Sequence, residues 1–232
     1  MTHQHTANPF QHPDTDDPTE FWEHRYGERD AIWSGRANRM LVDTVSDLTP
    51  GRALDLGCGE GGDAIWLAER GWVVTGVDIS PTAIARATRA AADRALVAEF
   101  HTVDLDTWRT DETYDLVTAC FLQSPLAFGR EQVLRRGAGL VRPGGHLLSV
   151  AHAAAPPWSG WAAPAKPGQA PAASSAADDP TITFPTPAGD LAALALGDDW
   201  EVLICEVRTR RATGPDGQES TLDDSVVLVR RR

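Results

Sequence analysis

The chain has 232 residues, of which 42% are hydrophobic, and a formal net charge of −12. This length and composition fit a single globular domain, and the negative charge argues against nucleic acid as a partner. No apolar run reaches membrane-spanning length and the N-terminus is unlike a signal peptide, so we expect a cytoplasmic protein without a membrane partner.

The first 18 residues are rich in His, Pro and Asp, and we predict that residues 1–18 form a disordered tail. Residues 19–232 are predicted to form one domain, which begins with two short helices before residue 47. Apolar runs then alternate with helical segments. The predicted strands are residues 53–56, 73–78, 97–103, 115–120 and 145–151, and the helices between them are residues 63–70, 81–94 and 130–140. This alternation predicts an α/β fold with a parallel sheet and helices on both faces.

Residues 153–180 differ from the rest because they are rich in Ala, Pro and Ser. We interpret them as a flexible loop on the ligand side of the sheet. Trp158 and Trp161 within it give two alternatives, a lid that closes over an apolar substrate or an insertion whose tryptophans pack on a nearby surface. The last predicted elements are a helix at 188–196 and strands at 200–211 and 225–229. A turn signal between these strands predicts an antiparallel hairpin at one sheet edge.

The most informative segment joins the first strand to the next helix. It reads DLGCGEGG from Asp55 to Gly62, and the following strand ends at Asp78. The spacing Gly57-x-Gly59-x-x-Gly62 satisfies the dinucleotide-binding fingerprint, and a Cβ in this turn would keep the backbone away from a ligand. The helix after the turn would direct its N-terminus at the ligand. Asp78 is predicted to accept hydrogen bonds from ribose hydroxyls.

Two carboxylates beside the turn favour one kind of ligand. Asp55 precedes the first glycine, and Glu60 lies within the turn. Acidic side chains would repel the pyrophosphate of a dinucleotide, but they suit a ligand that carries an ammonium and a sulfonium group. An NAD-type oxidoreductase remains an alternative, because the glycines and Asp78 also fit its fingerprint.

The segment LDLGCGEGGDAIWLAERGWVVTGVDIS resembles the first signature of class I S-adenosylmethionine-dependent methyltransferases. Three later segments also resemble this family: FHTVDL at 100–105, YDLVTAC at 114–120 and LVRPGGHLL at 140–148. The likeness covers about residues 20–152 and continues into the C-terminal strands. With its WEHRY segment at 22–26, the chain is most similar to small-molecule methyltransferases of the thiopurine and tellurite-resistance type.

The resemblance implies a Rossmann-like sheet of seven strands, mostly parallel with an antiparallel C-terminal strand. It also implies an enzyme of class EC 2.1.1 that uses S-adenosylmethionine and releases S-adenosylhomocysteine. The residues predicted to bind the cofactor are Asp55, Gly57, Cys58, Gly59, Gly62, Asp78, Ile79, Asp104, Leu105 and Cys120. The resemblance places Asp104 near the adenine amino group, and Cys120 at the end of a strand that faces the reactive methyl group.

Methyl transfer from a sulfonium is an in-line displacement, in which the protein mainly aligns the nucleophile and excludes water. We therefore predict transfer to a small-molecule acceptor. A soft nucleophile such as a thiolate needs no catalytic base, whereas a phenol or an amine can need one. A non-catalytic cofactor-binding protein of the same fold is a further alternative. The accepting atom and the oligomeric state stay open.

Four side chains are candidates on the substrate side. Trp33, Gln123 and His152 are predicted to contact the substrate, and Tyr26 and His152 are the candidates for catalysis. Packing of helix on sheet is the alternative for Tyr26 and Trp33, and a solvated strand-end histidine is the alternative for His152. The three cysteines, Cys58, Cys120 and Cys205, lie at no metal-ligand spacing, so no metal site is predicted.

Overall fold

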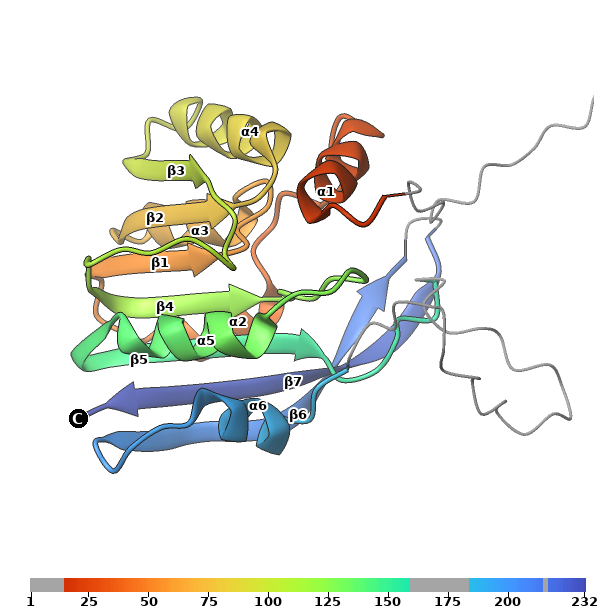
Figure 1. Ribbon diagram of the computed structural model, residues 1–232. Coiled ribbons are helices and arrows are strands. Elements are labelled where there is room, and N and C mark those ends of the chain that lie inside the picture. Colours follow the sequence, from red (N-terminus) through yellow and green to blue (C-terminus); the bar gives the residue numbers. More distant parts are fainter. Residues whose placement is uncertain (1–14, 159–183, 215–216) are drawn as a thin grey trace, which may run out of the picture.

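The computed structural model describes residues 15–158, 184–214 and 217–232 (Figure 1). The strands are β1 (Arg52–Leu56), β2 (Val73–Asp78), β3 (Ala98–Thr102), β4 (Tyr114–Cys120), β5 (Val141–His152), β6 (Trp200–Thr213) and β7 (Glu219–Arg231). The helices are α1 (Pro18–Gly27), α2 (Arg39–Val45), α3 (Gly62–Glu69), α4 (Pro81–Ala92), α5 (Arg130–Gly139) and α6 (Pro187–Leu194). No helix in these ranges is long and apolar enough to cross a membrane.

The sheet has seven strands in the order β3-β2-β1-β4-β5-β7-β6 within the described ranges. Strands β1 to β5 pair in parallel, and β7 runs antiparallel to both β5 and β6. This confirms the predicted Rossmann-like sheet with an antiparallel C-terminal strand. Strand order reverses between β1 and β4, and ligands bind such sheets at that point, beyond the carboxyl ends of the strands.

Strands β6 and β7 are longer than predicted. Their ladder runs from Trp200 opposite Arg231 to Thr213 opposite Glu219. The additional residues are mainly Arg, Thr, Ser and Asp, so hydrophobic periodicity did not reveal them. Backbone pairing across the hairpin stabilises them without an apolar pattern.

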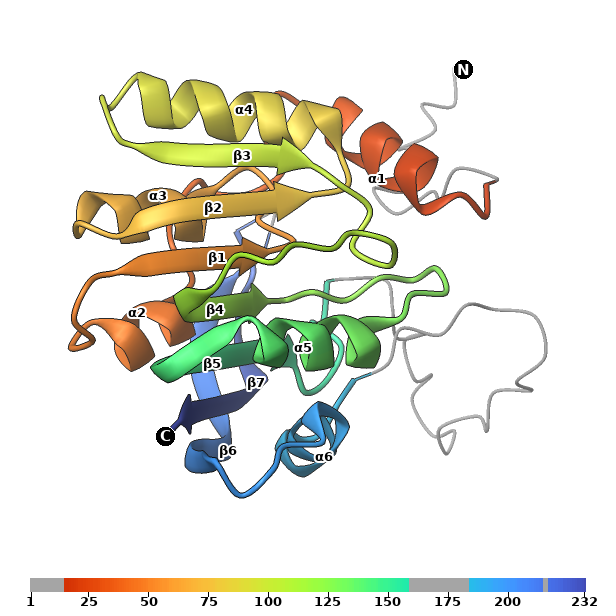
Figure 2. The ribbon, with the colours of Figure 1, turned by 60° about the vertical axis from the view of Figure 1, so that its left-hand side comes forward.

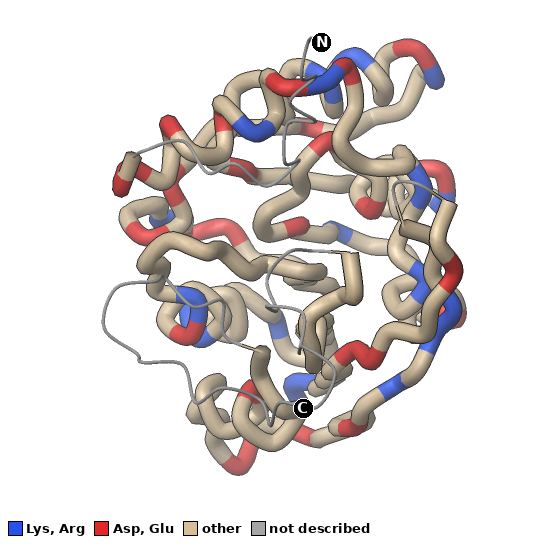
Figure 3. The backbone as a smooth tube through the Cα atoms, turned by 90° about the vertical axis from the view of Figure 1, so that its right-hand side faces the viewer, with Lys and Arg blue, Asp and Glu red and all other residues tan. Residues whose placement is uncertain are grey.

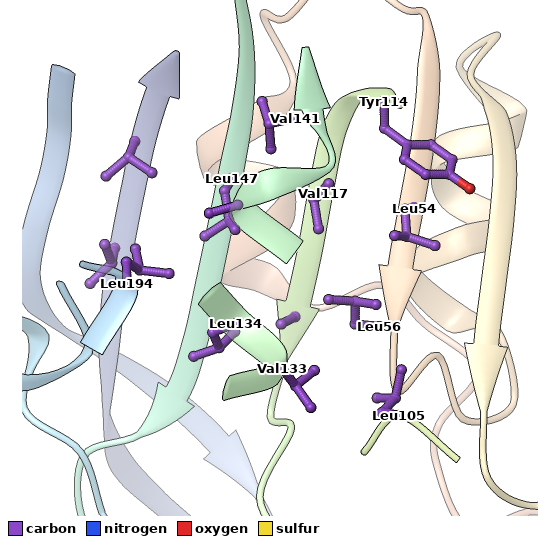
Figure 4. Close-up of a cluster of buried hydrophobic side chains, with 14 of the residues drawn as sticks. Leu54, Leu56, Leu105, Tyr114, Val117, Val133, Leu134, Val141, Leu147 and Leu194 are labelled. Carbon is purple, nitrogen blue, oxygen red and sulfur yellow. The ribbon is translucent and has the colours of Figure 1, made fainter. Parts of the chain in front are cut away.

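Helices cover both faces of the sheet, with α2 and α3 on one face and α5 and α6 on the other (Figures 1 and 2). Side chains alternate between the faces along each strand. In β1, Leu54 and Leu56 belong to the apolar cluster under α5 (Figure 4), whereas Ala53 belongs to the cluster under α2 and α3. The same alternation points Asp55 toward α3, and this placement determines its neighbours.

The connection between β3 and β4 carries no helix in the part of the chain that the structure describes. Residues 103–113 cross the α5 face of the sheet with a single turn after Asp104. The helix next to this connection on the same face is α5, which follows β4. This face is therefore covered less completely near β1 than the opposite face is.

The N-terminal boundary of the domain differs from the prediction. Helix α1 begins at Pro18, and the Asp17 side chain accepts hydrogen bonds from the backbone N–H groups of Thr19 and Glu20. Asp17 and Pro18, which the predicted tail includes, therefore belong to the start of α1. An Asp-Pro pair is a strong helix start, but composition alone counted both residues toward disorder. Residues 1–14 lie outside the described residues.

The predicted loop at 153–180 is described only at its beginning. The Trp158 ring lies so close to Gly214, after β6, that a Cβ on that glycine would be 2.8 Å from the ring. Trp158 thus packs on the β6–β7 hairpin, in agreement with the surface-packing alternative for this residue. Trp161 and residues 159–183 lie outside the described residues, so the lid remains a prediction.

Candidate active site

The glycine turn after β1 has a backbone that requires glycine. Gly57, Gly59 and Gly61 have positive φ angles of 72°, 52° and 83°, which side chains other than glycine rarely adopt. A Cβ on Gly57 would lie 2.6 Å from the Leu122 side chain, and one on Gly59 would lie 2.9 Å from the Tyr26 hydroxyl. The turn is also fixed to β2, because Gly57 donates its N–H to the Val77 carbonyl at 2.8 Å.

The third glycine of the turn serves a different purpose from the one its spacing suggests. Gly61, not Gly62, has the left-handed conformation and precedes α3 as its N-cap. Gly62 instead allows a close approach, because a Cβ there would lie 3.0 Å from the Arg36 carbonyl oxygen. One glycine supplies the left-handed backbone and the other allows the close approach of Arg36, so two consecutive glycines are needed. The spacing rule identified only Gly62.

Asp78 is held rigidly at the end of β2. Its two carboxylate oxygens accept hydrogen bonds from the backbone N–H groups of Gly59, at 2.9 Å, and Ser80, at 3.0 Å. The residue is buried, and burial raises the pKa of Asp78 although these hydrogen bonds oppose the shift. The carboxylate therefore links the glycine turn to the start of α4.

Asp55 belongs to a cluster of acidic side chains on the α3 side of the turn. The Thr118 hydroxyl donates to Asp55 at 2.8 Å. Burial, and then the nearby Asp63 carboxylate, raise the pKa of Asp55 to about 8. Burial also raises the pKa of Asp63, which accepts a hydrogen bond from the Asn38 N–H at 2.6 Å and another from the thiol of Cys120. Sequence reasoning missed Asp63, although its place in the first turn of α3 is where the dipole favours an acid.

The interactions that set these three pKa values involve carboxylates, a hydroxyl, a thiol and backbone groups, and no basic side chain of the described ranges is among them. Each carboxylate is thus easier to protonate than in water. A cationic ligand would reverse this tendency by stabilising the ionised carboxylates. The site is therefore electrostatically suited to a positive ligand.

Glu60 does not belong to this acidic cluster, contrary to the prediction. Its carboxylate accepts hydrogen bonds from the backbone N–H groups of Ile32 and Trp33, at 3.1 and 2.9 Å, and pairs with Arg86 of α4 at 2.7 Å. These partners neutralise it, so it is not available for a cationic ligand. Its role in the structure is to attach the segment after α1 to the glycine turn.

Replacing Glu60 by alanine is expected to loosen the segment at residues 28–36 and to lower the free energy of unfolding by about 1 kcal/mol, because three hydrogen bonds are lost. Trypsin would then cleave faster at the exposed Arg29 and Arg36. Glu69→Ala is the matched control, because Glu69 forms a surface ion pair with Arg94 at 2.8 Å. Equal trypsin sensitivity in the two variants would contradict the assigned role.

Tyr26 and Trp33 lie together over the glycine turn. The Trp33 indole N–H donates to the Tyr26 hydroxyl at 3.3 Å, and both side chains are within 3.4 Å of the position that a Cβ on Gly59 would take. Burial and the charge of Asp78 raise the pKa of Tyr26, so its hydroxyl stays protonated. Helix α1, which carries Tyr26, is held against α4 because Glu23 accepts a hydrogen bond from the Ser80 hydroxyl at 2.6 Å.

Gln123 and His152 are neighbours at the carboxyl ends of β4 and β5. The backbone N–H of His152 donates to the side-chain oxygen of Gln123 at 2.8 Å. The His152 ring centre lies 4.3 Å from that of Phe121. His152 Nδ1 is 3.2 Å from a carboxylate oxygen of Asp224, which is fully buried and pairs with Arg210 at 2.5 Å. The alternative of a solvated histidine is therefore wrong, because this ring has a buried carboxylate partner.

Phe121, Asp224 and Arg210 were missed from the sequence. Phe121 has a positive φ of 55°, an unusual conformation for an aromatic residue, and it directly follows the strand predicted to face the methyl group. Asp224 and Arg210 are on β7 and β6, and only the pairing of β7 with β5 brings Asp224 opposite His152. No local motif in the sequence marks that pairing.

The remaining predicted cofactor residues occupy the same edge of the sheet. Asp104 is exposed and accepts a hydrogen bond from its own loop, from the Asp106 N–H at 2.9 Å. Leu105 is buried in the cluster under α5, Ile79 follows Asp78, and Cys58 is buried in the glycine turn. Contacts of these residues with a cofactor remain predictions. Among the described residues, no group of three or more His, Cys, Asp or Glu is arranged to hold a metal.

The strand order, the glycine turn after β1 and the acidic residue that ends β2 together define the class I methyltransferase fold, the fold class that uses S-adenosylmethionine. The sequence agrees, since residues 53–145 match the family described as a methyltransferase domain. Over these residues the chain is similar to the methyltransferase family, in agreement with the predicted resemblance.

Known proteins of this kind resemble parts or all of the chain. Thiocyanate methyltransferase 1 of Arabidopsis thaliana is 32% identical over 151 residues, which cover 59% of this chain and 65% of that protein. The matches span 37% to 65% of the length of the first three curated relatives. TehB of Haemophilus influenzae superposes with a TM-score of 0.63 at 20% identity, over 92% of this chain and 67% of that one.

The N-methyltransferase NodS of Bradyrhizobium japonicum, solved with S-adenosylhomocysteine, superposes with a TM-score of 0.61 at 17% identity. This match covers 93% of this chain and 99% of that one. At these identities the two structural likenesses show the fold alone. They nevertheless cover a larger share of the chain than the matched residues 53–145 do.

Proposed function

We propose that this protein transfers the methyl group of S-adenosylmethionine to a small-molecule acceptor by in-line displacement. The observation that carries this proposal is the acidic cluster of Asp55, Asp63 and Asp78 around the glycine turn. S-adenosylmethionine brings a sulfonium and an ammonium to such a site. Each cation would favour the ionised form of a carboxylate whose pKa is now raised, and this supplies binding free energy.

The same cluster argues against the NAD-type alternative. A pyrophosphate at this turn would find no basic side chain among the groups that act on these three carboxyl groups, and it would repel any of the three that ionised. Like charges at such distances raise the free energy of the complex. The oxidoreductase is therefore not favoured, in line with the match to a methyltransferase domain.

The proposed roles of the site residues follow from their placement. The three glycines and Asp78 would position the nucleoside, with Asp78 accepting from the ribose hydroxyls. Tyr26 and Trp33 would cover the methionine end and exclude water. Gln123 and His152 would form the acceptor side beyond β4 and β5.

A small acceptor fits the charge distribution at this edge of the sheet. Acidic and basic residues are interspersed along the backbone on the side that the strand ends face (Figure 3). The net charge of −12 likewise does not favour a nucleic acid, because its phosphates require basic groups. Two relatives of Arabidopsis thaliana, thiocyanate methyltransferase 1 and probable thiol methyltransferase 2, have names that indicate small acceptors in those proteins.

The direct test incubates the full chain with S-adenosylmethionine and a panel of thiols, thiocyanate, phenols and amines, and measures S-adenosylhomocysteine. We expect formation of this product with at least one acceptor and 1:1 binding of the cofactor by calorimetry. Micromolar binding of NAD without binding of S-adenosylmethionine would overturn the proposal. Cofactor binding without turnover on any acceptor would favour the non-catalytic alternative.

His152 provides a second test, of the acceptor side. If the His152 imidazole accepts the proton of a phenol acceptor, His152→Gln is expected to lower kcat for phenols about tenfold. This factor corresponds to the loss of roughly one charge-assisted hydrogen bond. Thiolate acceptors, which need no base, would be affected little. Equal losses on both acceptor classes would instead assign His152 to packing. Asp224→Asn serves as the companion variant, because it leaves the imidazole present but removes its charged partner.

A further inference from the structure

A cavity of about 330 Å³ opens on the α5 face of the sheet, away from the acidic cluster on the α3 side. It lies where the β3–β4 connection carries no helix in the described chain. Its apolar walls include Leu56, Leu105, Trp108 and Val133. Three of these, Leu56, Leu105 and Val133, converge beneath α5 in Figure 4.

The packing of α5 explains both the floor and the opening of this cavity. At Gly137 the helix approaches β1 closely, because a Cβ there would lie 3.1 Å from the Leu56 side chain. At Gly139, the last residue of α5, a Cβ would meet no atom within 4 Å. The helix therefore closes the inner end of the cavity and leaves space at its C-terminal end.

Two arginines also line the cavity. Arg136 of α5 donates to the Leu105 carbonyl at 2.5 Å, and Arg109 donates to the Trp108 carbonyl at 2.7 Å. Neither guanidinium forms an ion pair with a carboxylate within the described ranges. The carboxylates that act on Arg136, those of Asp106 and Asp104, also accept backbone hydrogen bonds from Gly129 and Asp106.

The two guanidinium groups that line this cavity repel each other. Burial, and then the neighbouring Arg109, lower the pKa of Arg136, although the carboxylates of Asp106 and Asp104 oppose this shift. Two like charges thus face one mostly apolar space, in a protein whose net charge is −12. A bound anion would neutralise both, and the fork of a guanidinium matches the two oxygens of a carboxylate.

We propose that this cavity binds a small apolar carboxylate, whose carboxylate group accepts hydrogen bonds from Arg109 and Arg136 while its aryl or alkyl body packs on Leu56, Trp108 and Val133. The volume is at the lower end of the range of about 300–1,000 Å³ for small-molecule sites. A polar group at one end and apolar walls elsewhere is the usual design of such sites. This ligand is distinct from cofactor and acceptor, although Leu105 of the cavity wall is also predicted to contact the cofactor, and it binds without methyl transfer.

The test is calorimetry of the full chain with 3-phenylpropanoate as the probe and 3-phenylpropanamide as its uncharged match. We expect saturable 1:1 binding of the carboxylate, unaffected by S-adenosylhomocysteine, and about tenfold weaker binding of the amide. The double variant that carries both Arg109→Gln and Arg136→Gln is expected to bind the carboxylate at least tenfold more weakly. Arg89→Gln, at a side chain that is 85% exposed on α4, is the control and should bind as the natural protein does.

A cavity-filling variant separates loss of binding from loss of the fold. Gly139→Leu is expected to abolish binding of the probe without lowering Tm, since the site has space for a side chain and leucine favours the helix. Absence of saturable binding by the natural chain would overturn the proposal. Binding that competes with S-adenosylhomocysteine, or that survives both the double variant and Gly139→Leu, would overturn it as well.

Discussion

Replacing Asp78 by alanine is expected to weaken the binding of S-adenosylhomocysteine by about 1.5–3 kcal/mol, or roughly 10- to 150-fold, the usual effect of losing charged hydrogen bonds. The loss has two sources. The ribose hydroxyls lose their acceptor, and the backbone N–H groups of Gly59 and Ser80 lose the carboxylate that orients the glycine turn. Calorimetry with the product measures the effect without turnover.

Two further variants make the Asp78 experiment specific. Asp78→Asn keeps one oxygen for a backbone N–H and should bind more tightly than Asp78→Ala, but more weakly than the natural protein. Asp93→Ala, at a side chain that is 71% exposed at the end of α4, should bind normally. A change of only a few tenths of a kcal/mol in Asp78→Ala would show that the ribose assignment is wrong.

Asp55 is expected to make the stability of the unliganded protein fall as pH rises. The folded state raises the pKa of Asp55 from 3.8 to about 8, so between these values the folded state binds more protons than the unfolded state. By linkage, the contribution of this group is fully present below pH 4 and decreases as the pH rises toward 8. Thermal unfolding at pH 5 and pH 8 measures the decrease.

The variant Asp55→Asn isolates this contribution. Its side chain can still accept the Thr118 hydrogen bond but does not titrate. We expect a smaller difference in Tm between pH 5 and pH 8 and a more stable unliganded protein at pH 8. The natural chain should bind S-adenosylhomocysteine more tightly as the pH rises from 6 to 8. Asp55→Asn should bind it more weakly and should not show this increase. A pH profile identical to that of the natural chain would contradict the raised pKa of Asp55.

Much of the fold was predictable because its signals are local. An apolar strand, a glycine-rich turn and an acidic strand end lie within 26 residues, from Ala53 to Asp78. Backbone sterics in that turn require glycine whatever the rest of the chain does. The parallel order of strands and helices then follows from right-handed crossovers. The structure brings Gly59, Asp55 and Asp78 together, and their contacts with a cofactor remain a prediction.

The parts that were missed depend on contacts between distant segments. Glu60 is satisfied by the backbone of residues 32 and 33, which no spacing rule connects to the glycine turn. Asp224 meets His152 only through the pairing of β5 with β7. Asp63 was placed on its helix but not toward the ligand, because that requires knowing which face of the sheet Asp55 points to. Long-range pairing, not propensity, decides these positions.

The position of β7 between β5 and β6 has a consequence for the order of assembly during synthesis. β6 leaves the ribosome before β7, yet among the described strands it pairs only with β7. It must therefore wait for the later strand before it can join the sheet. The same later strand brings Asp224 to His152. On a nascent chain, the glycine turn can form early, whereas the acceptor side is completed only once β7 has emerged.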